Sequence, residues 1–354
     1  MKRYGNLYEE ILSFENLLLA SKKAFRGKRG KRKVAEFYFE LEKELLCLRE
    51  ELLNKTYEPR PLRTFLIFEP KEREIGASDF RDRVVHHAVC NVIEPIFERN
   101  FIAHSYACRE GKGTHRAIRQ AQVFSRKYRY FLKCDIRKYF ASIDHDILKE
   151  MLVRKFKDPE LLWLLFKIID SSTGNSTVSS TDNFIDGSTD SSVPDVKGKG
   201  LPIGSLTSQH FANLYLDRLD HHVKDSLHVK AYLRYMDDFI FFSDEKFELH
   251  LLHAKIRSFL NSELKLELKE KETVLAPVIE GVPFLGFRIF PNLIRLKQEN
   301  KKRALRKIKS TNKAFRTGKI GEEEYARSLM SSTEHLKTAN TYRLRKDIFS
   351  KMFF

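Results

Sequence analysis

Cysteines and long apolar runs are both scarce in this sequence of 354 residues. The four cysteines show no CxxC or other spacing typical of zinc sites and suit a reducing compartment as free thiols: Cys47, Cys90, Cys108 and Cys134. No apolar stretch approaches the roughly 20 residues of a membrane-spanning helix. The basic start, MKRYGNLYEE, lacks the apolar core of a signal peptide. We therefore expect a cytoplasmic protein with no zinc at its cysteines and no membrane partner.

Acidic residues are also in deficit, because 48 Asp and Glu face 65 Lys and Arg and leave a net charge of +17. This excess predicts a polyanionic partner, since phosphate neutralisation with counterion release dominates affinity for nucleic acids. A hydrophobic content of 42% excludes a disordered chain. The length allows one large core or two to three subdomains.

The most informative stretch runs from Ala231 to Ser243, AYLRYMDDFIFFS. Its alternating, β-branched and aromatic residues predict two strands of a hairpin with Asp237 and Asp238 at the tight turn. An ordinary exposed turn is the commoner setting of an Asp-Asp pair. Here both flanks are hydrophobic, which favours the edge of a buried sheet and a divalent cation that neutralises the two carboxylates.

A second apolar run, Tyr130 to Ile136, contains a further acid, Asp135. Mg²⁺ takes a few carboxylate oxygens and leaves the rest of its shell to water and phosphates. Two such ions about 3.5–4 Å apart activate an attacking hydroxyl and stabilise the leaving oxygen. Asp135, Asp237 and Asp238 could supply the ligands of such a pair.

These motifs, together with GLPIGSLTSQ from Gly200 to Gln209, resemble in order and content the palm motifs of reverse transcriptases. The resemblance extends from about Pro59 to about Phe290. Within the family the chain looks most like the enzymes of diversity-generating retroelements. Its middle motif has Ile203-Gly204, three residues and then Ser208-Gln209, where group II intron enzymes usually have Gln-Gly, three residues and then Ser-Pro.

The resemblance implies an α+β right-hand polymerase with an antiparallel palm sheet, α-rich fingers and a small helical thumb. We expect a helical N-terminal extension over residues 1–58, fingers and palm over 59–290, and a basic helical thumb over 291–354. Residues 171–199, rich in Ser, Thr, Asp and Gly, are expected to form a mobile surface insertion.

Local patterns predict further elements. A helix is expected from Leu7 to Ala24, followed by a basic run, Arg26 to Arg32, that would meet template RNA. A basic strand pair is expected from Arg60 to Ile75, and Asp79 is expected to cap the helix that follows. The alternation from Leu264 to Leu275 predicts a strand.

The resemblance also assigns roles to individual residues. It implies that the three aspartates are catalytic. It also implies that two Mg²⁺ ions, which Mn²⁺ can replace, are bound by Asp135, Ile136, Asp237 and Asp238. For the incoming nucleotide, it implies that Lys71 and Arg73 bind the triphosphate and that Phe140 packs beneath the sugar. Ile203, Gly204 and Gln209 are the other expected nucleotide contacts. It gives template and primer to Arg109, Lys112, Phe284, Leu285 and Gly286. A lysine that protonates pyrophosphate is expected at Lys269 or Lys271, and the choice stays open.

The implied activity is error-prone cDNA synthesis from a template-repeat RNA for mutagenic retrohoming. Its partners would be template RNA, RNA/DNA hybrid, dNTPs and a small basic accessory protein, in a bacterial, archaeal or phage-encoded system. One alternative is an antiviral-defence or retron-type reverse transcriptase, although the Val-Thr-Gly thumb signature of retrons is absent. A catalytically inactive RNA-binding protein is the other, and the intact acids argue against it.

Overall fold

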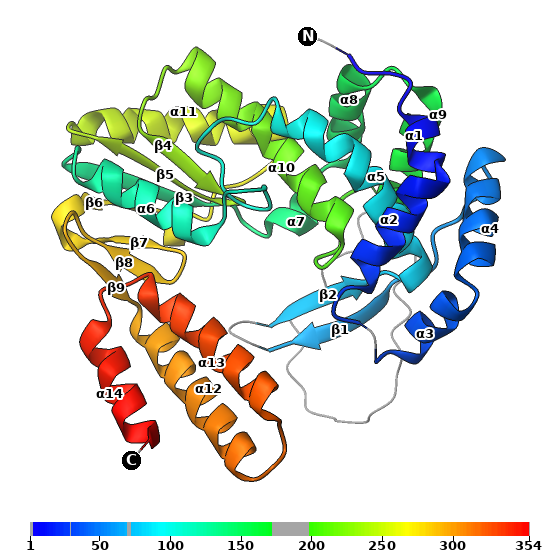
Figure 1. Cartoon of the computed structure of the whole chain (residues 1–354). Helices are drawn as coiled ribbons and strands as arrows, with labels where there is room; N and C mark the ends of the chain where they lie inside the picture. The colour runs from blue at the N-terminus through cyan, green and yellow to red at the C-terminus, as the bar shows by residue number, and fades with distance from the viewer. Residues whose placement is uncertain (1–2, 29, 69–71, 172–197, 354) are drawn as a thin grey trace, which may run out of the picture. The chain divides into compact units, whose positions relative to one another are not determined.

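The computed structural model describes residues 3–28, 30–68, 72–171 and 198–353 (Figure 1). Two compact units divide the chain, and each is built from three separate segments. The first unit contains Met1–Ala103, Ile136–Ser226 and Arg257–Glu267. The second contains His104–Asp135, Leu227–Ile256 and Leu268–Phe354. Lys71 and nearly all of the expected insertion lie outside the described residues.

The first unit is mainly helical. Its helical segments are α1 (Tyr8–Leu12), α2 (Phe14–Phe25), α3 (Arg32–Phe39), α4 (Leu41–Leu53), α5 (Phe80–Glu98), α7 (Tyr139–Ser142), α8 (His145–Lys155), α9 (Pro159–Asp170), α10 (Leu206–His221) and the π-helical turn η1 (His222–Ser226). A single helix was predicted for Leu7–Ala24, but Ser13 interrupts it. Ser13 adopts φ −58° and ψ 139°, and its side chain accepts a hydrogen bond from the Asn16 amide, so it caps a new helix.

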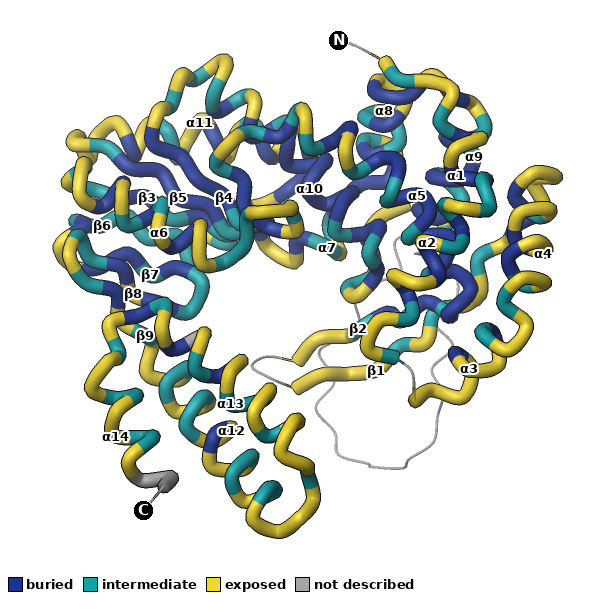
Figure 2. The backbone as a smooth tube through the Cα atoms, in the orientation of Figure 1, coloured by how far each residue is buried: buried dark blue, intermediate teal, exposed yellow. Residues whose placement is uncertain are grey.

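Helix α5 forms the centre of the first unit and packs against α2 and α10. As predicted, Asp79 caps it by accepting a hydrogen bond from the Arg81 amide. Figure 2 shows α5 and α10 buried along much of their length, whereas the antiparallel hairpin of β1 (Arg63–Ile67) and β2 (Arg73–Ala77) is largely exposed. This hairpin matches the basic strand pair expected from the sequence.

The second unit is organised around an antiparallel sheet in the order β4-β5-β3-β6. Its strands are β3 (Tyr130–Asp135), β4 (Tyr232–Tyr235), β5 (Asp238–Ser243) and β6 (Val274–Pro277). A smaller sheet contains β7 (Val282–Phe284), β8 (Phe287–Ile289) and β9 (Ile294–Leu296). Helix α6 (Thr114–Ser125) packs on β4 and β8, and α11 (Lys246–Leu264) runs across the division between the units.

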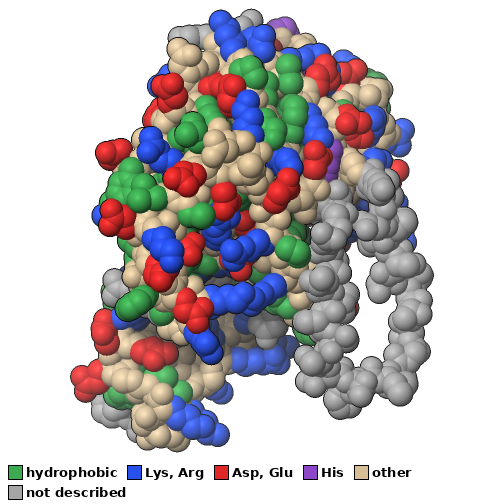
Figure 3. All heavy atoms as spheres, turned by 90° about the vertical axis from the view of Figure 1, so that its right-hand side faces the viewer, with side chains coloured by type: hydrophobic (Ala, Val, Ile, Leu, Met, Phe, Trp, Pro, Cys, Tyr) green, Lys and Arg blue, Asp and Glu red, His purple; other side chains and the backbone are tan. Residues whose placement is uncertain are grey.

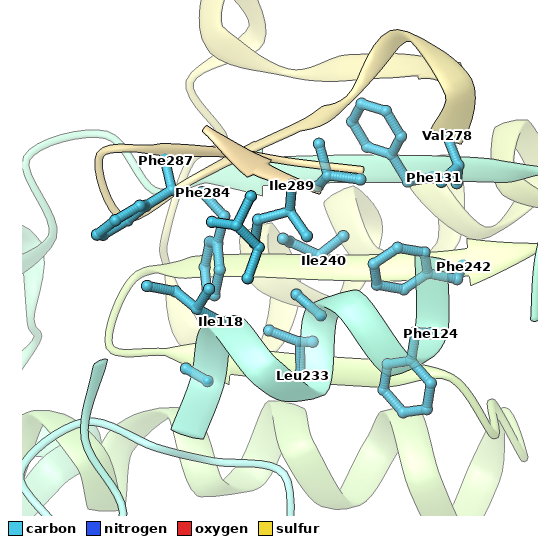
Figure 4. Packing of buried hydrophobic residues seen from close by; sticks show 14 of the residues in the cluster. Ile118, Phe124, Phe131, Leu233, Ile240, Phe242, Val278, Phe284, Phe287 and Ile289 are labelled. Carbon is cyan, nitrogen blue, oxygen red and sulfur yellow. The ribbon is translucent and has the colours of Figure 1, made fainter. Parts of the chain in front are cut away.

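One hydrophobic core joins the two sheets and α6. Side chains from these elements point toward one another in Figure 4: Ile118, Phe124, Phe131, Leu233, Ile240, Phe242, Phe284, Phe287 and Ile289. Because every second residue of a strand points to the same face, Phe131 shares this face of β3 with Lys133 and Asp135. The core therefore fixes the strand whose last residue is Asp135.

Three helices complete the second unit: α12 (Gln298–Arg316), α13 (Glu322–Lys337) and α14 (Tyr342–Phe353). Helices α12 and α13 pack together through the stacked rings of Phe315 and Tyr325, whose centroids are 4.3 Å apart. Within the described residues, no helix is both long and apolar enough to cross a membrane. The helices and antiparallel sheets confirm the predicted α+β class.

The strand predicted over Leu264–Leu275 was wrong for most of its length. Lys265 adopts φ +50° after the end of α11, and the short 3-10 helix η2 (Glu270–Glu272) follows before β6. Leu266 and Leu268 are buried, and only Leu268 takes part in β pairing, as a single bridge. Their alternation therefore reflects an irregular segment packed on the core.

Candidate active site

The two-aspartate motif forms a tight hairpin between β4 and β5. Tyr235 pairs with Asp238, so the turn consists of Met236 and Asp237 alone. This corrects the expectation that both aspartates occupy the turn, because Asp238 is the first residue of β5. Met236 adopts φ +57°, an unfavourable backbone conformation for a residue with a side chain.

The third aspartate lies directly across the sheet from the second. Asp135, the last residue of β3, is the register partner of Asp238. Directly opposed residues of an antiparallel pair share one face, with Cβ atoms roughly 4.5–5.5 Å apart. Burial raises the pKa of the Asp238 carboxyl to about 7, Lys133 opposes this rise, and the charges of Asp135 and Asp237 add to it. The end of β3, the start of β5 and the turn before it thus bring three acidic side chains close together.

The donor chemistry of the three aspartates fits a hard divalent cation, since carboxylate oxygens are the ligands that Mg²⁺ and Mn²⁺ prefer. Their mutual repulsion would be relieved by such an ion. Nevertheless, no group of three or more His, Cys, Asp or Glu side chains in the described part of the chain has the geometry of a formed metal site. Ile136, the fourth expected ligand, is the first residue of its segment in the other unit.

A buried arginine, which the sequence analysis missed, supports this turn. Arg234 on β4 is fully buried, and its Nη1 donates a hydrogen bond to the Met236 carbonyl oxygen at 3.1 Å. Its backbone amide donates to the His104 carbonyl, and its carbonyl accepts from the Tyr106 amide. A charged residue inside an otherwise apolar strand was the available signal.

The backbone bonds of Arg234 also attach the expected template loop to the sheet. Within this loop Arg109 Nη1 donates to the Ser105 carbonyl at 3.0 Å, and Lys112 Nζ lies 5.4 Å from the centre of the Tyr106 ring. Gly113 adopts φ +92° and donates its amide to the Tyr106 carbonyl. Both cations therefore belong to a loop that is bonded to β4, the strand that leads into the turn of Met236 and Asp237.

The expected primer segment is a turn anchored in the core. Phe284 is buried among the hydrophobic residues of Figure 4, so it supports the turn from beneath. Leu285 and Gly286 lie in the turn between β7 and β8. The Gly286 carbonyl accepts hydrogen bonds from the Lys297 amide at 3.0 Å and from Asn300 Nδ2 at 3.2 Å.

Of the two lysines expected near pyrophosphate, Lys269 is directly tied to the site. Its backbone amide donates to the Asp135 carbonyl at 2.8 Å, and its Nζ contacts Glu272 Oε1 at 2.5 Å. Lys271 lies within η2. The backbone of Lys269 therefore lies beside Asp135, whereas its ammonium group contacts Glu272, and the choice between the two lysines stays open.

The nucleotide residues expected in the first unit are brought together by backbone bonds. Leu201 donates its amide to the Phe140 carbonyl at 2.8 Å, and the Ile203 carbonyl accepts from the Gly76 amide at 3.0 Å. The loop that contains Leu201 and Ile203 is therefore bonded to Phe140 on one side and to β2 on the other. Arg73 is the first residue of that strand, and Gln209 lies within α10.

A pocket of about 220 Å³ opens beside this loop, with Gly204, Ser205 and Phe65 in its wall. Lys28 and Arg83 also line it, and no acidic side chain does. Burial, followed by the charges of Arg83 and Lys31, lowers the pKa of Lys28. The sequence did not indicate that Lys28 would line this pocket, although it shows the basic run that contains Lys28.

Two adjacent histidines line the same pocket, and we expect them to make the free energy of unfolding depend on pH. Burial lowers the pKa of His86 from 6.5 to about 3 and that of His87 to about 4. Because the folded state favours the neutral rings, the free energy of unfolding should be highest above pH 6.5 and fall as the pH drops toward 4. Equilibrium denaturation at several pH values measures this slope.

Substitution of His86 by Gln should flatten that slope, since the amide can keep a contact with Ser205 Oγ, which lies 3.3 Å from His86 Nδ1. Substitution of the exposed His115 by Gln is the control and should leave the slope unchanged. An acid dependence that His86→Gln does not alter would contradict the assignment.

Comparison with known proteins identifies the family. The family model described as "Reverse transcriptase (RNA-dependent DNA polymerase)" matches residues 69–289. Protein YkfC of Escherichia coli (strain K12) is 27% identical over 287 residues, which cover 70% of this chain and 71% of that protein. Group II intron-encoded protein LtrA of Lactococcus lactis subsp. cremoris is 23% identical over 313 residues, and the match spans 70% of this chain but half of LtrA.

Among solved structures, apo telomerase from Candida tropicalis, truncated from its C-terminal domain, has a TM-score of 0.47 and 13% sequence identity. That match covers 70% of this chain and 59% of the telomerase chain. The similarity is too low to support a functional conclusion. The family match alone spans more than half of the sequence, and the chain therefore belongs to the reverse transcriptases, the RNA-dependent DNA polymerases.

Proposed function

We propose that this chain synthesises DNA on an RNA template and that Asp135, Asp237 and Asp238 form its reaction centre. The observation that carries the proposal is the register pair of Asp135 and Asp238 beside the turn that contains Asp237. Divalent ions, when bound, would activate the primer 3′-hydroxyl and offset charge on the leaving pyrophosphate. Asp135 and Asp237 would hold these ions with Asp238 beside them, and the hydrogen bond from Arg234 to the Met236 carbonyl supports the turn.

The first unit supplies the nucleotide contacts in this proposal. Arg73, together with Lys71, neutralises the triphosphate, because cations over the β- and γ-phosphates stabilise departing pyrophosphate. Phe140 packs beneath the sugar and excludes a 2′-hydroxyl. Gly204 lets its backbone approach the templating base pair closely. The pocket beside Gly204, which is lined by cations and no acid, suits a template nucleotide.

The excess of positive charge is proposed to bind template and product duplex. Figure 3 shows Lys and Arg mixed with Asp and Glu over the face on which α3 and α4 lie, so the excess does not gather there. By contrast, α12 is strongly basic, with Lys301, Lys302, Arg303, Arg306, Lys307, Lys309, Lys313 and Arg316. Its cations would neutralise phosphates of the product duplex.

Primer extension on poly(rA) with oligo(dT) tests the proposed activity. We expect incorporation of dTTP that requires the primer and a divalent metal. A folded protein that binds the primed template but extends nothing under any metal condition would instead support the alternative of a catalytically inactive RNA-binding protein.

Within the family, we assign the chain to diversity-generating retroelements, with a template-repeat RNA and a small basic accessory protein as partners. Support comes from Ile203-Gly204 and Ser208-Gln209, which replace the Gln-Gly and Ser-Pro usual in group II intron enzymes. The similarity to LtrA, whose name describes a group II intron-encoded protein, favours an intron-type enzyme as the second candidate. Base selection distinguishes the two.

Replacement of Ile203 by Gln is expected to lower misincorporation opposite template adenine more than opposite other bases, by roughly tenfold. A Gln amide can hydrogen-bond around the incoming nucleotide, so a displaced mispair leaves it unpaired, whereas Ile203 offers only apolar contact. The side chain is half-buried and its backbone bond to Gly76 does not depend on the substitution. Sequencing of cDNA from one defined RNA provides the error frequencies.

Ile203→Leu is the matched control and should keep the error pattern of the unmodified enzyme. An active Ile203→Gln enzyme with an unchanged adenine error frequency would mean that Ile203 merely fills space. The retroelement assignment would then lose its mechanistic support, while the polymerase assignment would stand.

A further inference from the structure

A lysine on β3 contacts the second aspartate of the catalytic hairpin. Lys133 precedes Asp135 by two residues and therefore shares its face of the sheet. It pairs in register with Ile240, which makes it the diagonal neighbour of Asp238 on the adjacent strand. Lys133 Nζ lies 3.0 Å from Asp238 Oδ1, with the two side chains only 12% and 18% exposed. The contact is an ion pair without the alignment of a hydrogen bond.

Lys133 offsets a repulsion between carboxylates that results from the register of β3 and β5. Asp135 and Asp238 are directly opposed, and like charges in that position destabilise a sheet. Asp237 adds a third negative charge from the adjoining turn. A buried carboxylate requires a compensating partner, and Lys133 provides a permanent one to Asp238.

We propose that Lys133 is a positioning residue that holds the Asp238 carboxylate in an ion pair. Asp135 and Asp237 then bind the metal directly, and Asp238 supports their positions without being a ligand. This inference rests on the proposed function and refines it, because it separates the roles of the two adjacent aspartates. Lys133 makes no contact with substrate in this scheme. It acts through Asp238, whose strand begins where the catalytic turn ends.

Measurement of metal binding in the absence of substrate distinguishes the roles of the three aspartates. Mn²⁺ titration followed by electron paramagnetic resonance should show an affinity lowered by about tenfold or more in Asp135→Asn and Asp237→Asn. Asp238→Asn should stay within about threefold of the unmodified protein, since Asp238 is not a direct ligand in this scheme.

Kinetics of two Lys133 variants test whether the lysine matters for catalysis. Lys133→Met keeps the length and apolar bulk of the side chain but removes its charge, so Asp238 is no longer held. We expect kcat to fall by about tenfold to 100-fold with the KM for dNTP nearly unchanged, because small misplacements in a reaction centre are costly. Lys133→Arg keeps the charge and should restore most of the rate.

Stability measurements show whether loss of the ion pair between Lys133 and Asp238 causes the expected fall in kcat. Lys133→Met should lower the free energy of unfolding by leaving Asp238 buried without its partner, and a second change, Asp238→Asn, should recover part of the loss. Lys149→Met is the matched control, since Lys149 is also partly buried, lies 2.6 Å from Asp170 and belongs to the first unit. It should leave kcat unchanged.

Two results would overturn the inference. One is a loss of Mn²⁺ affinity in Asp238→Asn equal to that in Asp237→Asn, which would make Asp238 a direct ligand. The other is a folded Lys133→Met enzyme with unaltered kcat, which would make Lys133 purely structural. Both leave the polymerase proposal intact, whereas normal Mn²⁺ binding and activity in all three aspartate variants would remove the proposed reaction centre itself.

Discussion

Substitution of Asp237 by Asn is expected to reduce primer extension by roughly 10³-fold or more while leaving RNA affinity nearly unchanged. The amide is almost isosteric but lacks the charge that a metal ligand needs, and Asp237 occupies one of the two positions of the catalytic turn. In our proposal RNA affinity resides in basic surfaces that the substitution does not change. Single-turnover extension and a binding titration on the same primed template measure the two effects.

Asp225→Asn is a suitable control, because Asp225 is an exposed residue of η1 that pairs with His221 at 2.7 Å. It should extend primers normally. Extension by the Asp237→Asn enzyme at a rate near that of the unmodified protein would disprove the assignment of the metal to this turn.

Substitution of Gly204 by Ala is expected to lower the free energy of unfolding by about 2–5 kcal/mol and to impair nucleotide incorporation. Gly204 adopts φ +111°, and an added Cβ would lie 2.9 Å from Ile75 Cγ2 and 3.4 Å from the Gly76 carbonyl oxygen. The new methyl group would force the loop away from β2 and disturb the pocket that both line. Chemical denaturation gives the stability, and the KM for dNTP reports on the proposed contact of the Gly204 backbone with the templating base pair.

Gly318 provides a matched control for the backbone strain. It adopts φ +67° with nothing within 4 Å of an added Cβ, so Gly318→Ala should cost only about 1–2 kcal/mol and leave KM unchanged. Equal losses of stability in the two variants would mean that close packing at Gly204 is unimportant.

Local sequence patterns predicted the elements whose partners are near in sequence. The hairpin of β4 and β5 followed from alternation, and the start of α5 from Asp79 as a cap. The order of the motifs around Asp135 and Asp237 was sufficient to indicate the family, which the comparisons then showed.

Features that depend on distant segments, or on a close competition between local structures, were not predictable. The break at Ser13 depends on a local competition between capping and helix continuation, which periodicity does not reveal. The contact of Lys133 with Asp238 requires the register of two strands separated by about a hundred residues. Likewise, Lys28 joins Gly204 in one pocket only after the first unit has folded.

The interleaving of the two units constrains how the protein can be divided. The chain passes between them after Ala103, Asp135, Ser226, Ile256 and Glu267. No contiguous fragment of the gene therefore encodes either unit, and a single proteolytic cut at any of these crossings splits at least one unit between two peptides. A nicked enzyme would keep its activity only while packing alone held those peptides together. One of the crossings directly follows Asp135, so any contiguous fragment that contains all three aspartates also carries the segment Ile136–Ser226 of the first unit.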